Sequence, residues 1–143
     1  MLIVLISLIL LITITLPIVS IAIDYSMDSS NIIETKSEVS KLINAVDMVY
    51  SRSGGSKELV VLNLPKATTL SFSNSSKSQS ASNQMDMGLA SFSYMFSDGN
   101  EKTVEIDINA KNINTKLYLN EGLNKVIVYM DDNSKNINFE IIE

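Results

Sequence analysis

The sequence predicts an α+β protein, in which a long N-terminal hydrophobic helix precedes a C-terminal antiparallel β-sandwich-like domain. Three observations predict this fold class. Residues 1–23 carry no charged side chain, residues 24–52 contain neither Gly nor Pro and repeat apolar residues at helical spacing, and the remainder breaks into short alternating segments. The 143-residue chain therefore divides into a helix over residues 1–53 and a globular β-domain over residues 56–143.

The hydrophobic segment, residues 1–23, is predicted to lie in apolar surroundings. At ~1.5 Å per residue it spans about 34 Å, close to the ~30 Å hydrocarbon core of a bilayer. It is apolar on every side, so it must be surrounded by lipid or by other helices. The residues proposed for these contacts are Leu5, Leu8, Leu11, Leu16 and Pro17. No Lys or Arg precedes the segment and no Ala-x-Ala site ends it, so it differs from a secretory signal peptide, and we expect further residues upstream of Met1.

Pro17 lies inside this segment. It has no N–H to donate to the carbonyl of Thr13, and its ring crowds that carbonyl, so a local kink or a melted turn is expected. The hydroxyls of Thr13 and Thr15 can bond nearby backbone carbonyls and ease this defect. Two interpretations stay open: an ordinary kinked transmembrane helix, and a helix flexible enough to move from a bilayer into a polymer core.

The amphipathic extension over residues 24–53 is predicted to continue the helix. Its apolar residues recur at spacings of three, four and seven, which places them on one stripe. They are Ile32, Val39, Leu42, Ile43, Val46, Val49 and Tyr50. Charged residues occupy the opposite side: Glu34, Glu38, Lys41 and Asp47. The stripe can therefore pack on a domain, and Ser53-Gly54-Gly55 predicts the end of the helix.

The β-domain is predicted to contain roughly six to eight short antiparallel strands. Strand patterns cover residues 58–64, 67–72, 89–96, 103–108, 117–119, 125–130 and 137–142. Turn clusters separate them, among them Asp98-Gly99-Asn100 and Asp131-Asp132-Asn133. The second cluster offers adjacent oxygen donors, but it lacks the alternate donors, central Gly and terminal Glu of a calcium loop. We interpret it as a plain turn.

The composition excludes several classes of function. The net charge is −5 without clusters of Lys or Arg, so the chain has no electrostatic footprint for nucleic acid. Because cysteine is absent, disulfides, thiolate metal sites and thiol nucleophiles are excluded together. Because histidine is absent, so are the commonest general base and metal ligand. We therefore expect no enzyme, no cofactor and no nucleic-acid partner.

A stretch rich in Ser, Asn and Gln, residues 74–83, is too polar to bury and predicts a surface loop. Its first residues, Asn74-Ser75-Ser76, match the sequon for N-glycosylation, so Asn74 is the proposed glycosylation site. The alternative is a bare solvated loop, in which the serines only keep the segment soluble.

Three segments, in this order along the chain, resemble a known family. Ala45-Val46-Asp47-Met48-Val49-Tyr50 and the following Ser53-Gly54-Gly55-Ser56-Lys57 lead into Glu58-Leu59-Val60-Val61-Leu62-Asn63-Leu64-Pro65. Near the end stands Glu121-Gly122-Leu123-Asn124-Lys125-Val126-Ile127-Val128-Tyr129. With the aliphatic N-terminal helix, they look like the helix exit, first strand and terminal hairpin of archaeal type IV pilin-like proteins made with class III signal peptides. The resemblance covers nearly the whole chain.

The resemblance implies a pilin of a cell-surface filament. Helices of many copies would form the core and the β-domains the outer sheath, and the filament would serve adhesion or surface attachment. Implied partners are other copies of the chain, the membrane before assembly and the pilus assembly machinery. The family's Gln-x-Ser-x-Glu-Phe type processing motif is absent here, so we expect several residues to be missing at the N-terminus. The alternative is a single-pass membrane-anchored extracellular β-domain that acts as an adhesin, a ligand-binding protein or a filament stator.

Overall fold

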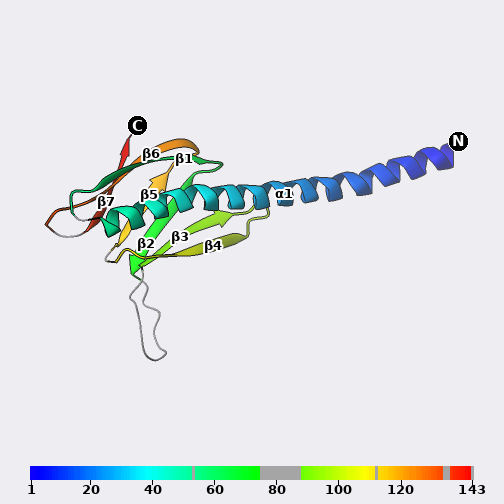
Figure 1. Ribbon diagram of the computed structural model, residues 1–143. Helices are drawn as coiled ribbons and strands as arrows, with labels where there is room; N and C mark the ends of the chain where they lie inside the picture. Colours follow the sequence, from blue (N-terminus) through cyan, green and yellow to red (C-terminus); the bar gives the residue numbers. More distant parts are fainter. Residues whose placement is uncertain (53, 75–87, 112, 134–135, 143) are drawn as a thin grey trace, which may run out of the picture.

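The structure is a computed structural model that describes residues 1–52, 54–74, 88–111, 113–133 and 136–142. In these residues one helix is followed by seven strands (Figure 1). Their bounds are α1 Leu2–Ser51, β1 Lys57–Leu64, β2 Thr68–Asn74, β3 Gly88–Met95, β4 Glu101–Ile108, β5 Thr115–Leu119, β6 Gly122–Met130 and β7 Ile137–Ile142. Every strand that the sequence predicts is present.

The helix α1 is unbroken along its 50 residues, Pro17 included. The melted turn expected at Pro17 therefore does not form, and Figure 1 shows only a gentle curvature of the axis over the blue, N-terminal part. The expected backbone bonds of the threonine hydroxyls are present. Thr13 donates to the Leu10 carbonyl at 2.9 Å and Thr15 donates to the Leu11 carbonyl at 2.8 Å. A single proline costs the helix one hydrogen bond, and a slight bend accommodates it.

Two antiparallel sheets form the β-domain, with strand orders β1-β6-β7 and β4-β3-β2-β5. The pairing of β1 with β6 runs from Lys57 opposite Tyr129 to Leu64 opposite Gly122, and the pairing of β3 with β4 is equally long. Buried and exposed residues alternate along most strands, as in β1, where Val60, Leu62 and Leu64 point inward. The predicted fold class, a long apolar helix followed by antiparallel sheets, is confirmed.

The C-terminal half of α1 lies in the same core as the sheets, along the side between β1 and β4 (Figure 1). Val39, Leu42, Val46 and Val49 are completely buried, at alternating spacings of four and three. They share one cluster with side chains of both sheets, among them Leu62, Leu70, Phe72, Phe92 and Val126. The predicted apolar stripe is therefore the stripe that packs, although Ile32 and Tyr50 are only half-buried. One element thus closes one side of the sandwich.

Between β5 and β6 the chain turns within Asn120 and Glu121, and Gly122 adopts a φ of +87° that other L-residues avoid. The buried Asn124 side chain holds this turn. Its amide nitrogen donates to the carbonyls of Asn120 and Gly122 at 2.7 and 3.0 Å, and its oxygen accepts the Asn120 N–H at 3.0 Å. This turn explains why β6 begins three residues before the strand pattern that the sequence shows.

The packing of α1 predicts the effect of truncating Leu42. Leu42→Ala should lower the free energy of unfolding by about 2–5 kcal/mol, because the lost side chain leaves a cavity in the common core. Ile33→Ala is the matched control, since Ile33 lies on the same helix but is 70% exposed, and it should change stability by less than about 0.5 kcal/mol. Guanidinium unfolding in detergent, followed by the near-UV signal of the tyrosines, measures both. Equal effects of the two substitutions would contradict this packing.

Candidate functional site

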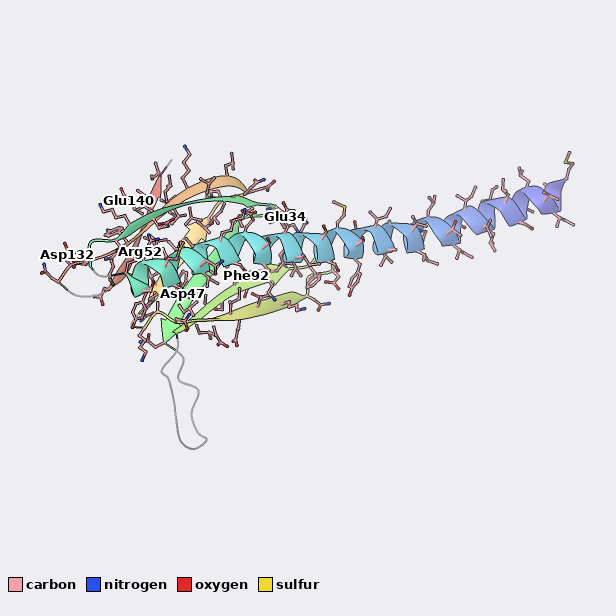
Figure 2. The ribbon with its side chains drawn as sticks, viewed as in Figure 1. Glu34, Asp47, Arg52, Phe92, Asp132 and Glu140 are labelled. Atoms are coloured by element: carbon pink, nitrogen blue, oxygen red, sulfur yellow. The ribbon has the colours of Figure 1, made fainter. Side chains whose placement is uncertain are left out.

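The N-terminal half of α1 projects from the β-domain without a covering element (Figure 2). All residues from 1 to 27 are exposed in the single chain. The leucines singled out from the sequence are more than half exposed: Leu5 56%, Leu8 55%, Leu11 62% and Leu16 63%. Pro17 is exposed as well. All five residues therefore lie on the projecting part, where apolar side chains surround the axis on every side.

This segment is long and apolar enough to cross a membrane. Burying a large apolar side chain is worth about 1.5–3 kcal/mol, so ten such side chains left in water would cost roughly 15–30 kcal/mol. The four hydroxyls of the segment are satisfied within the helix, since Ser7 donates to the Ile3 carbonyl and Ser20 to the Pro17 carbonyl, both at 2.9 Å, alongside the two threonine bonds. The segment can therefore be covered by lipid or by other helices without stranding a hydroxyl group.

The projecting part begins at a polar contact that we call the helix latch: Asp28, Lys66, Tyr94 and Ser97. Asp28 is the first buried residue of α1, with 4% of its surface exposed. One carboxylate oxygen accepts the Tyr94 hydroxyl at 3.0 Å and lies 3.6 Å from the Lys66 ammonium. The other accepts the Ser97 N–H at 2.8 Å. The Lys66 ammonium also lies 4.9 Å from the centre of the Tyr94 ring. A buried charge is thus hydrogen-bonded and paired.

The latch lowers the pKa of Asp28 below its ordinary value. The Ser97 N–H is the main cause, because it donates to the charged carboxylate. Burial acts in the opposite direction, and the Tyr94 hydroxyl and the Lys66 ammonium add to the lowering. Asp28 is therefore charged at neutral pH and fixes the point where α1 leaves the β-domain.

Two further carboxylates of α1 bind backbone groups of the β-domain. Glu38 accepts the Asn63 N–H at 2.9 Å. Burial raises the pKa of Glu38, but its bonds with Lys41 and Asn63 bring the pKa below the ordinary value. Asp47 accepts the Asn109 N–H at 2.9 Å and the Asn109 side-chain amide at 3.0 Å.

Sequence reasoning placed Glu38 and Asp47 on the charged side of the helix and did not single out Asp28. In the structure both Glu38 and Asp47 are half-buried and bound to the domain. A signal for Asp28 existed. It lies seven residues before Thr35, in line with the buried Leu42 and Val49 at further steps of seven, so helical geometry directs it toward the core.

Beside the latch, a cavity of about 270 Å³ lies where α1 leaves the β-domain. Its lining combines apolar and acidic side chains: Ile21, Asp24, Tyr25, Asp28, Phe96, Ser97 and Asp98. Ile21, Asp24 and Tyr25 belong to the projecting part of α1, so the cavity extends along the start of that part.

The cluster at Asp131-Asp132-Asn133 lies in a turn against the end of α1. A Cβ added to Gly54 or Gly55 would lie 2.8 or 2.9 Å from an oxygen of Asp132, so the two glycines leave room for that carboxylate. Across the described ranges, no group of three or more acidic residues is arranged to hold a metal ion.

Asn74 is the last residue of β2 and is exposed. The rest of its sequon, Ser75 and Ser76, lies outside the described residues, as does most of the polar stretch. Glycosylation of Asn74 therefore stays a prediction.

Comparisons with protein-family models, with curated proteins and with solved structures give no match.

The latch predicts a defined pH dependence of stability. Folding lowers the pKa of Asp28, so the ionised carboxylate stabilises the folded state. This contribution to the free energy of unfolding is complete above about pH 3.9, the ordinary pKa of an aspartate, and is lost as the pH falls through the pKa of Asp28 in the folded protein. The difference in unfolding free energy between wild type and Asp28→Asn should therefore shrink as the pH is lowered from about 6 to about 2. Asp24→Asn controls for the loss of a charge on the neighbouring turn. A difference that does not vary with pH would contradict an ionic latch.

The sequon at Asn74, together with the exposure of this residue, predicts a glycan in the native protein. Mass spectrometry of the peptide that contains Asn74, taken from cells that naturally make the chain, should show added sugar mass. Asn74→Gln should remove this mass and leave the fold intact, since the side chain lies at the exposed end of a strand. An unmodified peptide as the only species would refute the prediction.

Proposed function

We propose that this chain is the structural pilin subunit of an archaeal type IV-like surface filament. Its apolar helices form the core of the filament, its β-domains form the outer sheath, and the filament serves adhesion or surface attachment. The observation that carries the proposal is the projecting half of α1, which is apolar on every side over residues 1–23 and uncovered in the single chain.

The continuity of α1 supports this proposal. The half of α1 that packs in the β-domain and the half that projects from it are one continuous helix, so no flexible linker separates the β-domain from the projecting segment. Between Ile23 and the buried Asp28 lie only four residues, about one turn. A subunit built in this way would bring its β-domain directly beside the bundle of apolar helices, as a sheath around a core requires.

Before assembly the same segment would hold the subunit in the membrane. Its length and hydropathy suit a single span, which also supports the second candidate, a membrane-anchored extracellular β-domain acting as an adhesin, a ligand-binding protein or a filament stator. The two functions differ in what covers the helix in the final state: other copies of the chain in the first, and lipid in the second.

A charge placed in the projecting helix tests the proposal. Leu8→Asp and Leu11→Asp should abolish filaments, because an unpaired carboxylate among packed helices costs about 3–5 kcal/mol per subunit. Electron microscopy of cells that express each variant measures this, with protease resistance of the β-domain as the test of folding. Leu8→Met keeps the volume and the apolar character, and it should leave filaments intact.

The wild type decides between the two candidates. A wild-type chain that stays in the membrane fraction and forms no filaments in its native cells would refute the pilin proposal and favour the anchored protein. Filaments of the Leu8→Asp and Leu11→Asp variants in normal amount would show that the helix does not lie in a filament core.

A further inference from the structure

A groove lies on the side of the sandwich that α1 does not cover. The helix packs mainly on β1 and β6 and reaches the ends of β4 and β7, but none of its residues lines this groove. Two edge strands, β5 and β7, border a groove of about 450 Å³. We call it the β5–β7 groove. Its lining consists of Asn114, Thr115, Lys116, Leu117, Tyr129, Asn136, Ile137, Asn138 and Phe139.

The apolar members of this lining are fixed by the core. Leu117 and Ile137 are each 6% exposed, so their positions are set by packing. Phe139 stacks on Phe72, with ring centroids 4.9 Å apart, and Phe72 is itself buried in the sandwich. The groove therefore has a preformed apolar base, as ligand sites of this size commonly have.

The polar members of the lining offer paired donors and acceptors. Asn114 is exposed and Asn138 is half-buried, and a carboxamide presents an acceptor oxygen beside a donor nitrogen. The Asn138 amide nitrogen donates to the Asn136 carbonyl at 3.4 Å, which engages one of its two N–H groups. Thr115 and Tyr129 add hydroxyls, each of which can donate and accept. Among the described residues that line the groove, Lys116 is the only charged one. The groove is thus rich in neutral hydrogen-bonding groups and poor in charge.

We propose that the β5–β7 groove binds a short neutral oligosaccharide. Each sugar hydroxyl is a donor and an acceptor at once and pairs with carboxamide and hydroxyl groups. The C–H face of a sugar ring suits the apolar base, to which the Phe139 ring belongs. The volume of the groove lies within the range of about 300–1,000 Å³ of small-molecule sites.

Other ligand classes fit the groove less well. Among the described lining residues, Lys116 alone offers a positive charge to a phosphorylated or strongly acidic ligand, and the net charge of −5 opposes polyanions. An extended peptide could add to the free edge of β5 or β7 through main-chain bonds, which does not require the amide-rich lining. A sugar ligand would specify what the proposed adhesive subunit attaches to. The role of the groove in adhesion rests on the proposed function, whereas sugar binding itself does not.

The test uses the full chain, solubilised as a monomer in a zwitterionic detergent without a sugar head group, so it does not depend on filament formation. The probes are neutral trisaccharides of glucose, mannose, galactose and N-acetylglucosamine, an acidic uronic-acid trisaccharide, and an extended hexapeptide of alternating Val and Thr. Isothermal titration and chemical shifts of residues in the groove measure binding. We expect at least one neutral trisaccharide to bind, with shifts at Thr115 and Asn138.

Asn114→Ala and Asn138→Ala should each weaken that binding about five- to tenfold, the effect of losing a hydrogen bond. Asn44→Ala is the matched control, because Asn44 is an exposed asparagine on α1, which contributes no residue to the lining of the groove, and binding should not change. Unchanged near-UV spectra and melting temperatures establish that the variants fold. Binding by no neutral probe, preference for the acidic probe or the peptide, or affinity that both groove variants leave unchanged would overturn the proposal. None of these outcomes bears on whether filaments form.

Discussion

The structure depends on one constraint: a single helix must satisfy two different environments along its length. In its C-terminal half, residues at alternating spacings of four and three enter the core. Without these side chains, the core would be open to solvent on that side of the sandwich. In its N-terminal half the same geometry presents apolar side chains all round. No glycine interrupts α1 and its one proline is accommodated, so the orientation of the β-domain fixes the direction in which the projecting half points.

The carboxylates of α1 supply directional contacts, which apolar packing alone does not provide. Hydrophobic burial is non-directional, and a smooth helix could slide or rotate against the sheets at modest cost. Asp28, Glu38 and Asp47 each accept a backbone N–H of the β-domain, from Ser97, Asn63 and Asn109. A shift of the helix by one residue would break all three bonds and strand the buried Asp28. These bonds therefore set the axial and rotational position of the helix.

Hydrophobic periodicity predicts the elements well, because helix and strand patterns are local: α1, its packing stripe and the seven strands follow from it. What it could not predict depends on distant partners. Glu38 and Asp47 look like solvent-facing charges, since Asn63 and Asn109 stand 25 and 62 residues away in sequence. Of the two outcomes expected at Pro17, a kink or a melted turn, the melted turn does not form, because the loss of one hydrogen bond does not outweigh the hydrogen bonds of the neighbouring helical residues. The β5–β7 groove, likewise, exists only once the order of strands in both sheets is known.

The spacing of the three carboxylate contacts has a mechanical consequence. The three contacts are distributed along the axis of α1, from Asp28 to Asp47, over roughly 28 Å of helix at ~1.5 Å per residue. Tension applied along the projecting helix would act as a shear force on the three carboxylate hydrogen bonds and on the packed apolar stripe at the same time. Tension at an angle to the axis would instead act first on Asp28, where the helix leaves the domain. The joint is therefore built to carry axial load and to yield to lateral load from one end.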